Sequence, residues 1–268
     1  PITCVGKTNI YCFKYSGKFS VTDGDKDSWK VRFLTTGSFT PYSNANIDAF
    51  LVGGGGGGMY NGTQCFDSVG GGGGYTANIK SKSLSSKTSY PVVIGAGGKI
   101  NYVNQAYTGG STIAFGNTAA GGFGGGCQVG GNGGSGGGYS RGNGGSDGSN
   151  GIYSNDVFGV GQIFSTREFG DPTGDLYAGG GGGGYLSANT LGGAGGGGNK
   201  GAPGIPNTGG GGGSNSDGNL SGAGGSGIVV IRASVSDEVT WTCIGGSTQY
   251  CFTYTGTYSL ENETTNNW

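Results

Sequence analysis

Short stretches in which apolar and polar residues alternate lie mainly towards the two ends of the chain. Residues 13–21 alternate in this way and residues 29–34 do so more clearly, with a hairpin-turn signal, Asp23-Gly24, between them. Further predicted strands cover residues 47–52, 75–79, 90–94 and 227–232, the last as a buried closing strand. The pattern predicts an all-β protein with essentially no α-helix.

Glycine fills the middle of the chain and accounts for 70 of its 268 residues, where about 7% is usual. The main blocks cover residues 53–58, 70–74, 121–126, 130–138, 179–184, 192–198 and 209–213. Glycine-rich linkers are commonly flexible coils, but Tyr, Phe, Leu, Ile and Val interrupt and flank these blocks. We therefore expect an ordered structure.

Two ordered conformations suit a run of six glycines. One is the polyproline-II (polyglycine-II) helix, whose outward backbone groups can bond parallel or antiparallel copies. The other is a series of tight turns with positive φ between very short strands. Turns do not need six consecutive glycines, so the runs favour a helix bundle between β-sandwich-like strands at both ends of the unit. Alanine at Gly55 or Gly182 should then cost more than about 1 kcal/mol.

An internal repeat predicts the domain organisation. Cys4, Cys12 and Trp29 recur, with their neighbours, as Cys243, Cys251 and Trp268, each 239 positions further on. We expect one repeat unit over residues 1–239 and the first strands of a second copy over 240–268. Within the unit, residues 1–50 form strands, 51–226 the glycine-rich bundle and 227–234 the closing strand. Such arrays usually serve mechanical reach or multivalent binding.

Several segments resemble a known group of proteins. They are residues 47–52 with the following glycines, 90–98, 166–170, 176–179 and 222–232. They look like the glycine-rich modules of phage tail fibre and tail-tip (adhesin) proteins, which also occur in surface proteins of gut Gram-positive bacteria. The resemblance covers most of residues 10–233. It implies stacked polyglycine helices with loops that contact host receptors, and it supplies no catalytic residues.

The remaining composition argues against several function classes. The net charge is −1 with no basic cluster, and no apolar run is long enough for membrane insertion, so we expect neither nucleic-acid binding nor a membrane span. There is no His, the common general base and metal ligand. A carboxylate pair among Asp156, Glu168, Asp171 and Asp175 is weighed against a solvated loop, which we favour. We expect no enzyme activity, no cofactor and no metal.

The cysteines are candidates for disulfide bonds. A hairpin through Lys7-Thr8 would place Cys4 opposite Cys12, and its copy would place Cys243 opposite Cys251. The alternative is pairs of small buried thiols. Cys65 and Cys127 are a third candidate pair on weaker grounds. Disulfides persist outside the cytosol or on a virion surface, which is where we expect the protein to be located.

Aromatic residues beside the glycine blocks are candidate receptor contacts. Rings on rigid loops offer contact area at low entropic cost and stack on sugars. The selected residues are Tyr60, Phe66, Tyr139, Tyr153 and Tyr185. The alternative is that these rings cap the ends of the bundle as small apolar clusters.

Together these features predict a structural, non-enzymatic component of an extracellular fibre. We expect a phage tail fibre or tail-tip protein that engages host receptors, a glycan or a protein, and associates with neighbouring units. The alternative is a bacterial cell-surface or secreted filament protein built from tandem glycine-rich repeats.

Overall fold

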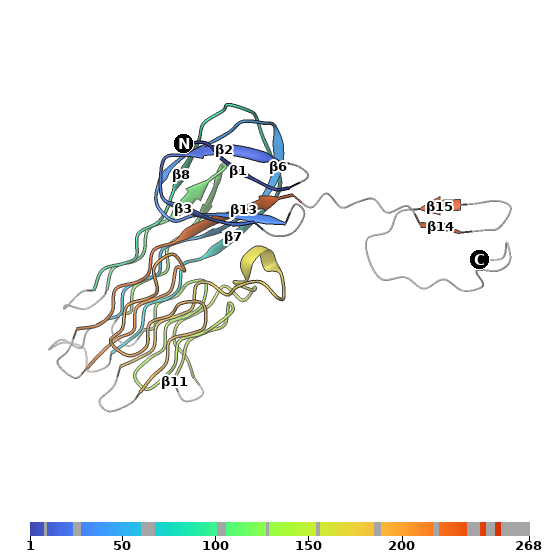
Figure 1. Cartoon of the computed structure of the whole chain (residues 1–268). Coiled ribbons are helices and arrows are strands. Elements are labelled where there is room, and N and C mark those ends of the chain that lie inside the picture. The colour runs from blue at the N-terminus through green and yellow to red at the C-terminus, as the bar shows by residue number, and fades with distance from the viewer. Residues whose placement is uncertain are drawn as a thin grey trace. The chain divides into compact units, whose positions relative to one another are not determined.

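The computed structural model divides the chain into two compact units, Pro1–Ser234 and Val235–Trp268. It describes residues 1–7, 10–23, 28–59, 68–100, 106–126, 129–153, 156–184, 189–216, 220–234, 242–244 and 250–252. In the second unit, β14 (Thr242–Ile244) pairs antiparallel with β15 (Tyr250–Phe252). The first unit holds a β-sandwich from which extended glycine runs project (Figure 1).

One sheet of the sandwich has six antiparallel strands in the order β1-β2-β5-β8-β9-β10. They are β1 (Thr3–Val5), β2 (Tyr11–Tyr15), β5 (Gly37–Pro41), β8 (Tyr90–Val93), β9 (Thr112–Ala114) and β10 (Asn117–Ala119). The other sheet has five antiparallel strands in the order β3-β4-β13-β6-β7. They are β3 (Phe19–Asp23), β4 (Trp29–Phe33), β13 (Ile228–Ala233), β6 (Ala45–Val52) and β7 (Thr76–Leu84). The described elements are completed by β11 (Ile152–Tyr153), β12 (Asp156–Val157) and a short 3-10 helix, η1 (Glu168–Gly170).

The core of the sandwich is aromatic. Phe13, Phe33 and Phe39 are fully buried between the sheets, and the rings of Phe33 and Phe39 meet edge to face at 5.3 Å between centroids. Tyr11 stacks on Trp29, also at 5.3 Å. Alternate residues of β2, β4 and β5 supply these side chains. The alternation of apolar and polar residues in the sequence therefore corresponds directly to the core.

The strand predicted over residues 13–21 is wrong in one respect, because it is two strands in different sheets. The chain leaves β2, crosses at Gly17 and enters β3. A Cβ atom on Gly17 would lie 2.8 Å from the carbonyl oxygens of Thr35 and Thr36. The crossing therefore needs glycine, and unbroken alternation across it hid the change of sheet.

The stretch 51–226 contains more than the bundle, because β7 to β10 lie within it and complete the sandwich. The β9–β10 hairpin was not predicted. Its turn residues Phe115 and Gly116 both have positive φ, 53° and 82°, as a two-residue hairpin turn requires. These strands are only three residues long, too short for a clear periodic signal.

The glycine runs form the predicted bundle of polyglycine helices. The run Gly53–Gly58 shows the pattern most clearly, because its amides point in turn to three neighbours and repeat every third residue. Its N–H groups donate to carbonyls of runs 69–75, 106–110 and 222–225. Its carbonyls accept from runs 95–98, 121–125 and 209–212. A polyproline-II-type helix has three residues per turn, so its successive backbone groups point in three directions, as they do here.

The six neighbours of this run also bond one another and close a ring around it. Bonds between successive neighbours join Gly72 to Phe123, Gly109 to Gly122, Gly110 to Ala96, Gly224 to Gly98, Gly225 to Gly210 and Gly71 to Gly212. Runs 69–75, 179–184 and 209–214 are surrounded in the same way. The bundle is therefore a hexagonal lattice whose interior helices are the longest glycine blocks of the sequence.

Candidate functional site

The end of the bundle remote from the sandwich gathers several segments that flank the predicted contact residues. The carbonyl of Ser68 accepts the amides of Ser140 (3.0 Å) and Gly184 (3.3 Å), and its hydroxyl donates to the carbonyl of Asn215 (3.1 Å). The amide of Met59 donates to the carbonyl of Val69 (2.9 Å). These bonds bring four distant parts of the chain to one place.

The predicted contact residues are next to these bonded segments. Tyr60 follows Met59, Phe66 lies two residues before Ser68, Tyr139 precedes Ser140 and Tyr185 follows Gly184. Tyr153 belongs to β11, in which the amide of Ile152 donates to the carbonyl of Asn143 (3.3 Å). The residue before Asn143 is Gly142, whose amide donates to the carbonyl of Tyr139. Tyr60, Phe66 and Tyr185, and the side chain of Tyr153, lie outside the described residues. The segments leading to all five meet at the same end.

Tyr139 is the one predicted contact whose side chain is described. It is 9% exposed, and its ring stacks on that of Phe158 at 4.2 Å with an interplanar angle of 8°. This packing favours the alternative role for Tyr139, a ring that caps the end of the bundle. Its role as a receptor contact stays a prediction.

Small polar side chains hold this end in place. Ser214 and Ser221 are buried; the hydroxyl of Ser214 donates to the carbonyl of Gly182 (3.5 Å), and that of Ser221 accepts the amide of Asn215 (3.0 Å). Buried Thr190 donates its hydroxyl to the carbonyl of Gly183. Because these groups satisfy backbone atoms where the runs stop, they fix the points from which the connections start. The sequence offered no signal for them, since Ser and Thr are frequent throughout.

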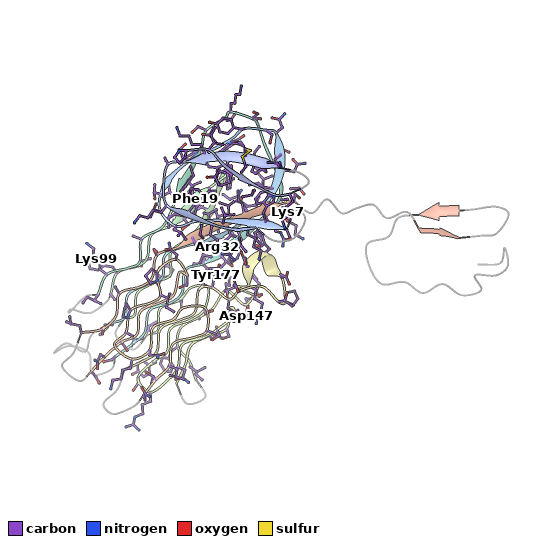
Figure 2. The ribbon with its side chains drawn as sticks, in the orientation of Figure 1. Lys7, Phe19, Arg32, Lys99, Asp147 and Tyr177 are labelled. Carbon is purple, nitrogen blue, oxygen red and sulfur yellow. A yellow bond between two sulfur atoms is a disulfide. The ribbon has the colours of Figure 1, made fainter. Side chains whose placement is uncertain are left out.

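A second cluster, of charged residues, lies where the sandwich meets the bundle. Glu168 has no exposed side-chain surface; its carboxylate binds Lys30 Nζ at 2.9 Å and Arg32 Nη2 at 3.3 Å. Arg32 also bonds Tyr177, and the two lie together in Figure 2. The prediction of a solvated loop is therefore wrong for Glu168. Lys30 and Arg32 alternate on the outward side of β4, which was the available signal that a segment covers this sheet.

The neighbouring residues extend this cluster across the sheet. Arg232 on β13 pairs with Asp48 on β6 at 3.3 Å, and its guanidinium lies 4.1 Å from the centroid of the Phe169 ring. Phe50 packs on Tyr177 from the same face, with centroids 5.4 Å apart. These contacts attach residues 166–178 to the outer face of the five-stranded sheet. In this arrangement the buried carboxylate is paired with two cations.

Of the remaining candidate carboxylates that the structure describes, Asp171 and Asp175 are exposed, and Asp175 shares Arg32 Nη2 as a partner with Glu168. Asp175 is 70% exposed in its side chain and bonds Arg32 at 3.3 Å. Asp171 is exposed; hydrogen bonds from Thr173 lower its pKa. The side chain of Asp156 lies outside the described residues. No group of three or more His, Cys, Asp or Glu in the described part of the chain could hold a metal ion, and no helix described there could cross a membrane.

The cysteines of the first hairpin are bonded. Cys4 on β1 and Cys12 on β2 form a disulfide and are directly opposite in the strand register. In the second unit, Cys243 and Cys251 are opposite each other in the same register, but their side chains lie outside the description. Cys65 and Cys127 lie outside the described residues, so those two pairings stay predictions. The repeat organisation is likewise a prediction.

Comparison with known proteins gives one family. A family model described as a glycine-rich domain matches residues 34–234, from the end of β4 through the bundle to β13. No curated protein matches the chain.

Proposed function

The chain belongs to the glycine-rich domain family, and we propose that it is a structural, non-enzymatic component of an extracellular fibre, a phage tail fibre or tail-tip protein that engages host-surface receptors. The observation that carries this proposal is the convergence of distant connections at one end of a rigid bundle. Residues 60–67, 185–188 and 217–219 connect segments that are cross-linked at that end through Ser68 and Asn215.

The physical argument concerns the cost of binding. A contact loop must be ordered when it binds, and that ordering opposes association. Runs such as 53–58 and 179–184 are held by hydrogen bonds on all sides, so the ends of each loop are already fixed. Aromatic residues on such loops then offer contact area at low entropic cost. A host-surface glycan, whose sugar faces stack on aromatic rings, is the partner we propose.

The Cys4–Cys12 disulfide supports a location outside the cytosol, on a virion or cell surface. The repeated N-terminal segment favours a second candidate, a bacterial cell-surface or secreted filament in which the units form a stalk. Its β14–β15 register reproduces that of β1–β2. Immunogold labelling of purified virions and of cell surfaces separates the two candidates, because each assigns the protein to only one of them.

The receptor proposal is tested by binding of the full chain to a glycan array and to host cells. Replacement of Tyr60, Tyr153 and Tyr185 by Ala should reduce binding at least tenfold. Tyr42→Ala is the matched control, since Tyr42 is 40% exposed and lies in the sandwich; its binding should match the wild type. Undiminished binding of the triple variant would remove the far end of the bundle as the receptor site.

A further inference from the structure

One side of the bundle is a flat layer of four glycine runs, 106–110, 121–126, 129–134 and 157–162. Successive runs are joined by bonds from Gly109 to Gly122 (2.9 Å), Phe123 to Asn132 (2.8 Å) and Gly133 to Val160 (3.0 Å). Each inner run also bonds two runs of the layer beneath: 121–126 bonds 53–58 and 69–75, and 129–134 bonds 69–75 and 136–138. Because each inner run lies between two runs of the layer beneath, the four runs lie in one plane.

Large apolar side chains project from this layer, which we call the flat face. Among the described residues, the inner runs that hold Phe123 and Val129 have bonded neighbours on every side except the outer one, so these two side chains project from the face. Tyr107 and Val160 lie on its two outer runs, and each of the four is at least 48% exposed. Exposed apolar groups gathered in this way mark interaction surfaces.

The apolar surface continues towards the sandwich at Ile163 and Phe164. Ile163 is 88% exposed and has a φ of 67°, a conformation rare for a β-branched residue. Buried Gln162 holds the turn, because its amide nitrogen donates to Thr76 Oγ1 (2.7 Å) and to the carbonyl of Phe164 (3.1 Å). The exposure of these two side chains is therefore fixed by the fold.

The absence of charged residues in the four runs indicates what binds the flat face. None of the residues in the four runs is charged; Lys99 lies in the run beside them, where its carbonyl accepts the amide of Tyr107 (3.1 Å). When two copies meet about a two-fold axis, the same residues face each other, so a charged patch would repel its copy. A flat, uncharged, apolar face suits contact with an identical face.

We propose that the flat face is a self-association surface, and that its partner is the flat face of a second copy of this chain. With about 3.1 Å per residue and about 4.8 Å between bonded backbones, the four runs cover on the order of 350 Å². That is under half of the about 800 Å² per partner of a standard interface. One pair of faces therefore associates weakly. If the fibre proposed above holds, repeated units add their contributions.

The test is sedimentation of the full chain at concentrations up to about 1 mM, where weak contacts are populated. The wild type should form a dimer at the upper concentrations. Phe123→Asp and Phe123→Lys should each sediment as monomers, because like charges face each other across the axis. An equimolar mixture of the two variants should dimerise again. Ile205→Asp is the control; Ile205 is 57% exposed in run 202–205, on the opposite side of the bundle.

Val160→Asp repeats the test at a second position, and an unchanged melting temperature establishes that each variant is folded. A wild type that stays monomeric throughout overturns the proposal. It is also overturned if Phe123→Asp dimerises like the wild type, or if the mixture of opposite charges stays monomeric. Dimer formation and receptor binding are separate measurements on separate residues, so failure of one proposal is distinguishable from failure of the other.

Discussion

At the scale of single residues, the lattice imposes a simple rule on sequence. In an interior run every position faces a neighbour, so a Cβ atom at Gly55 would meet the carbonyl oxygen of Gly210 at 2.1 Å. In outer runs one position in three faces outwards and accepts a side chain, as at Ala96 and Lys99 or Ala120 and Phe123. The longest glycine blocks, such as 53–58 and 179–184, are therefore interior helices, and blocks interrupted every third residue are outer ones.

This rule refines the expected effect of alanine in two interior runs. At Gly182 the nearest atom to an added Cβ is the carbonyl oxygen of Leu191 at 2.9 Å, so a small shift accommodates it. At Gly55 the obstructing atom belongs to another interior run, which is held on all sides. The larger loss of stability is expected at Gly55.

Glu168 is the most buried of the charged residues described. Glu168→Gln keeps its shape but leaves Lys30 and Arg32 without their buried counter-charge. We expect a loss of about 2 kcal/mol, below the value for a fully buried pair because both cations are partly exposed. Chemical denaturation of the full chain measures it. Asp175→Asn removes the exposed partner of Arg32 and should cost less than about 0.5 kcal/mol; equal losses would show that burial of Glu168 contributes nothing.

The carboxylate of Asp147 makes the stability of the fold depend on pH. Burial raises its pKa, but hydrogen bonds from Ser165 and Thr166 and the charge of Arg167 outweigh burial and lower it below 3.8. Because the pKa of Asp147 is lower in the folded state than in the unfolded state, its ionised form stabilises the fold at pH values above the unfolded-state pKa. This stabilisation is lost as the pH falls through the folded-state pKa. Asp147→Asn should therefore melt earlier than the wild type at pH 6, with the difference shrinking below pH 3.8. A difference independent of pH would contradict this assignment.

At the scale of elements, periodicity predicted strands with a clear apolar pattern and missed several strands without one. β4, β6 and β13 were found because alternate or continuous apolar residues reach the core. β5, β9 and β10 show no such pattern in their three to five residues, and tertiary pairing creates them. The same holds for η1, whose Phe169 has a φ of 59° that local sequence does not demand. Convergence at Ser68 also depends on lattice positions that no local pattern encodes.

The β1–β2 hairpin depends on its covalent link. The two strands lie at the edge of the six-stranded sheet, and the disulfide joins residues separated by eight positions. The loop-entropy relation gives a contribution of about 2.5 kcal/mol for a closed loop of this length. Replacing Cys4 and Cys12 by Ser should lower the free energy of unfolding by about that amount in non-reducing denaturation. The wild type in reductant is the control, and equal stability of wild type and variant without reductant would contradict the assignment.

At the scale of the whole molecule, the first unit has two cores of different kinds. The sandwich is stabilised by buried aromatic and aliphatic side chains such as Phe13, Phe33 and Phe39. The interior runs of the bundle consist of glycine, as at 53–58 and 179–184, and are stabilised by backbone hydrogen bonds to the runs packed around them. This difference explains how a chain with only 32% hydrophobic residues forms an ordered first unit.

The central claim is that interior glycine runs are the core of the bundle, and one comparison of thermal unfolding tests it most directly. Gly55→Ala and Gly110→Ala add the same methyl group, but its nearest atom is 2.1 Å away at Gly55 and 3.0 Å away at Gly110, in an outer run. We predict that Gly55→Ala loses about 3 kcal/mol and that Gly110→Ala stays within about 1 kcal/mol of the wild type. Equal melting temperatures for Gly55→Ala and the wild type would contradict the account.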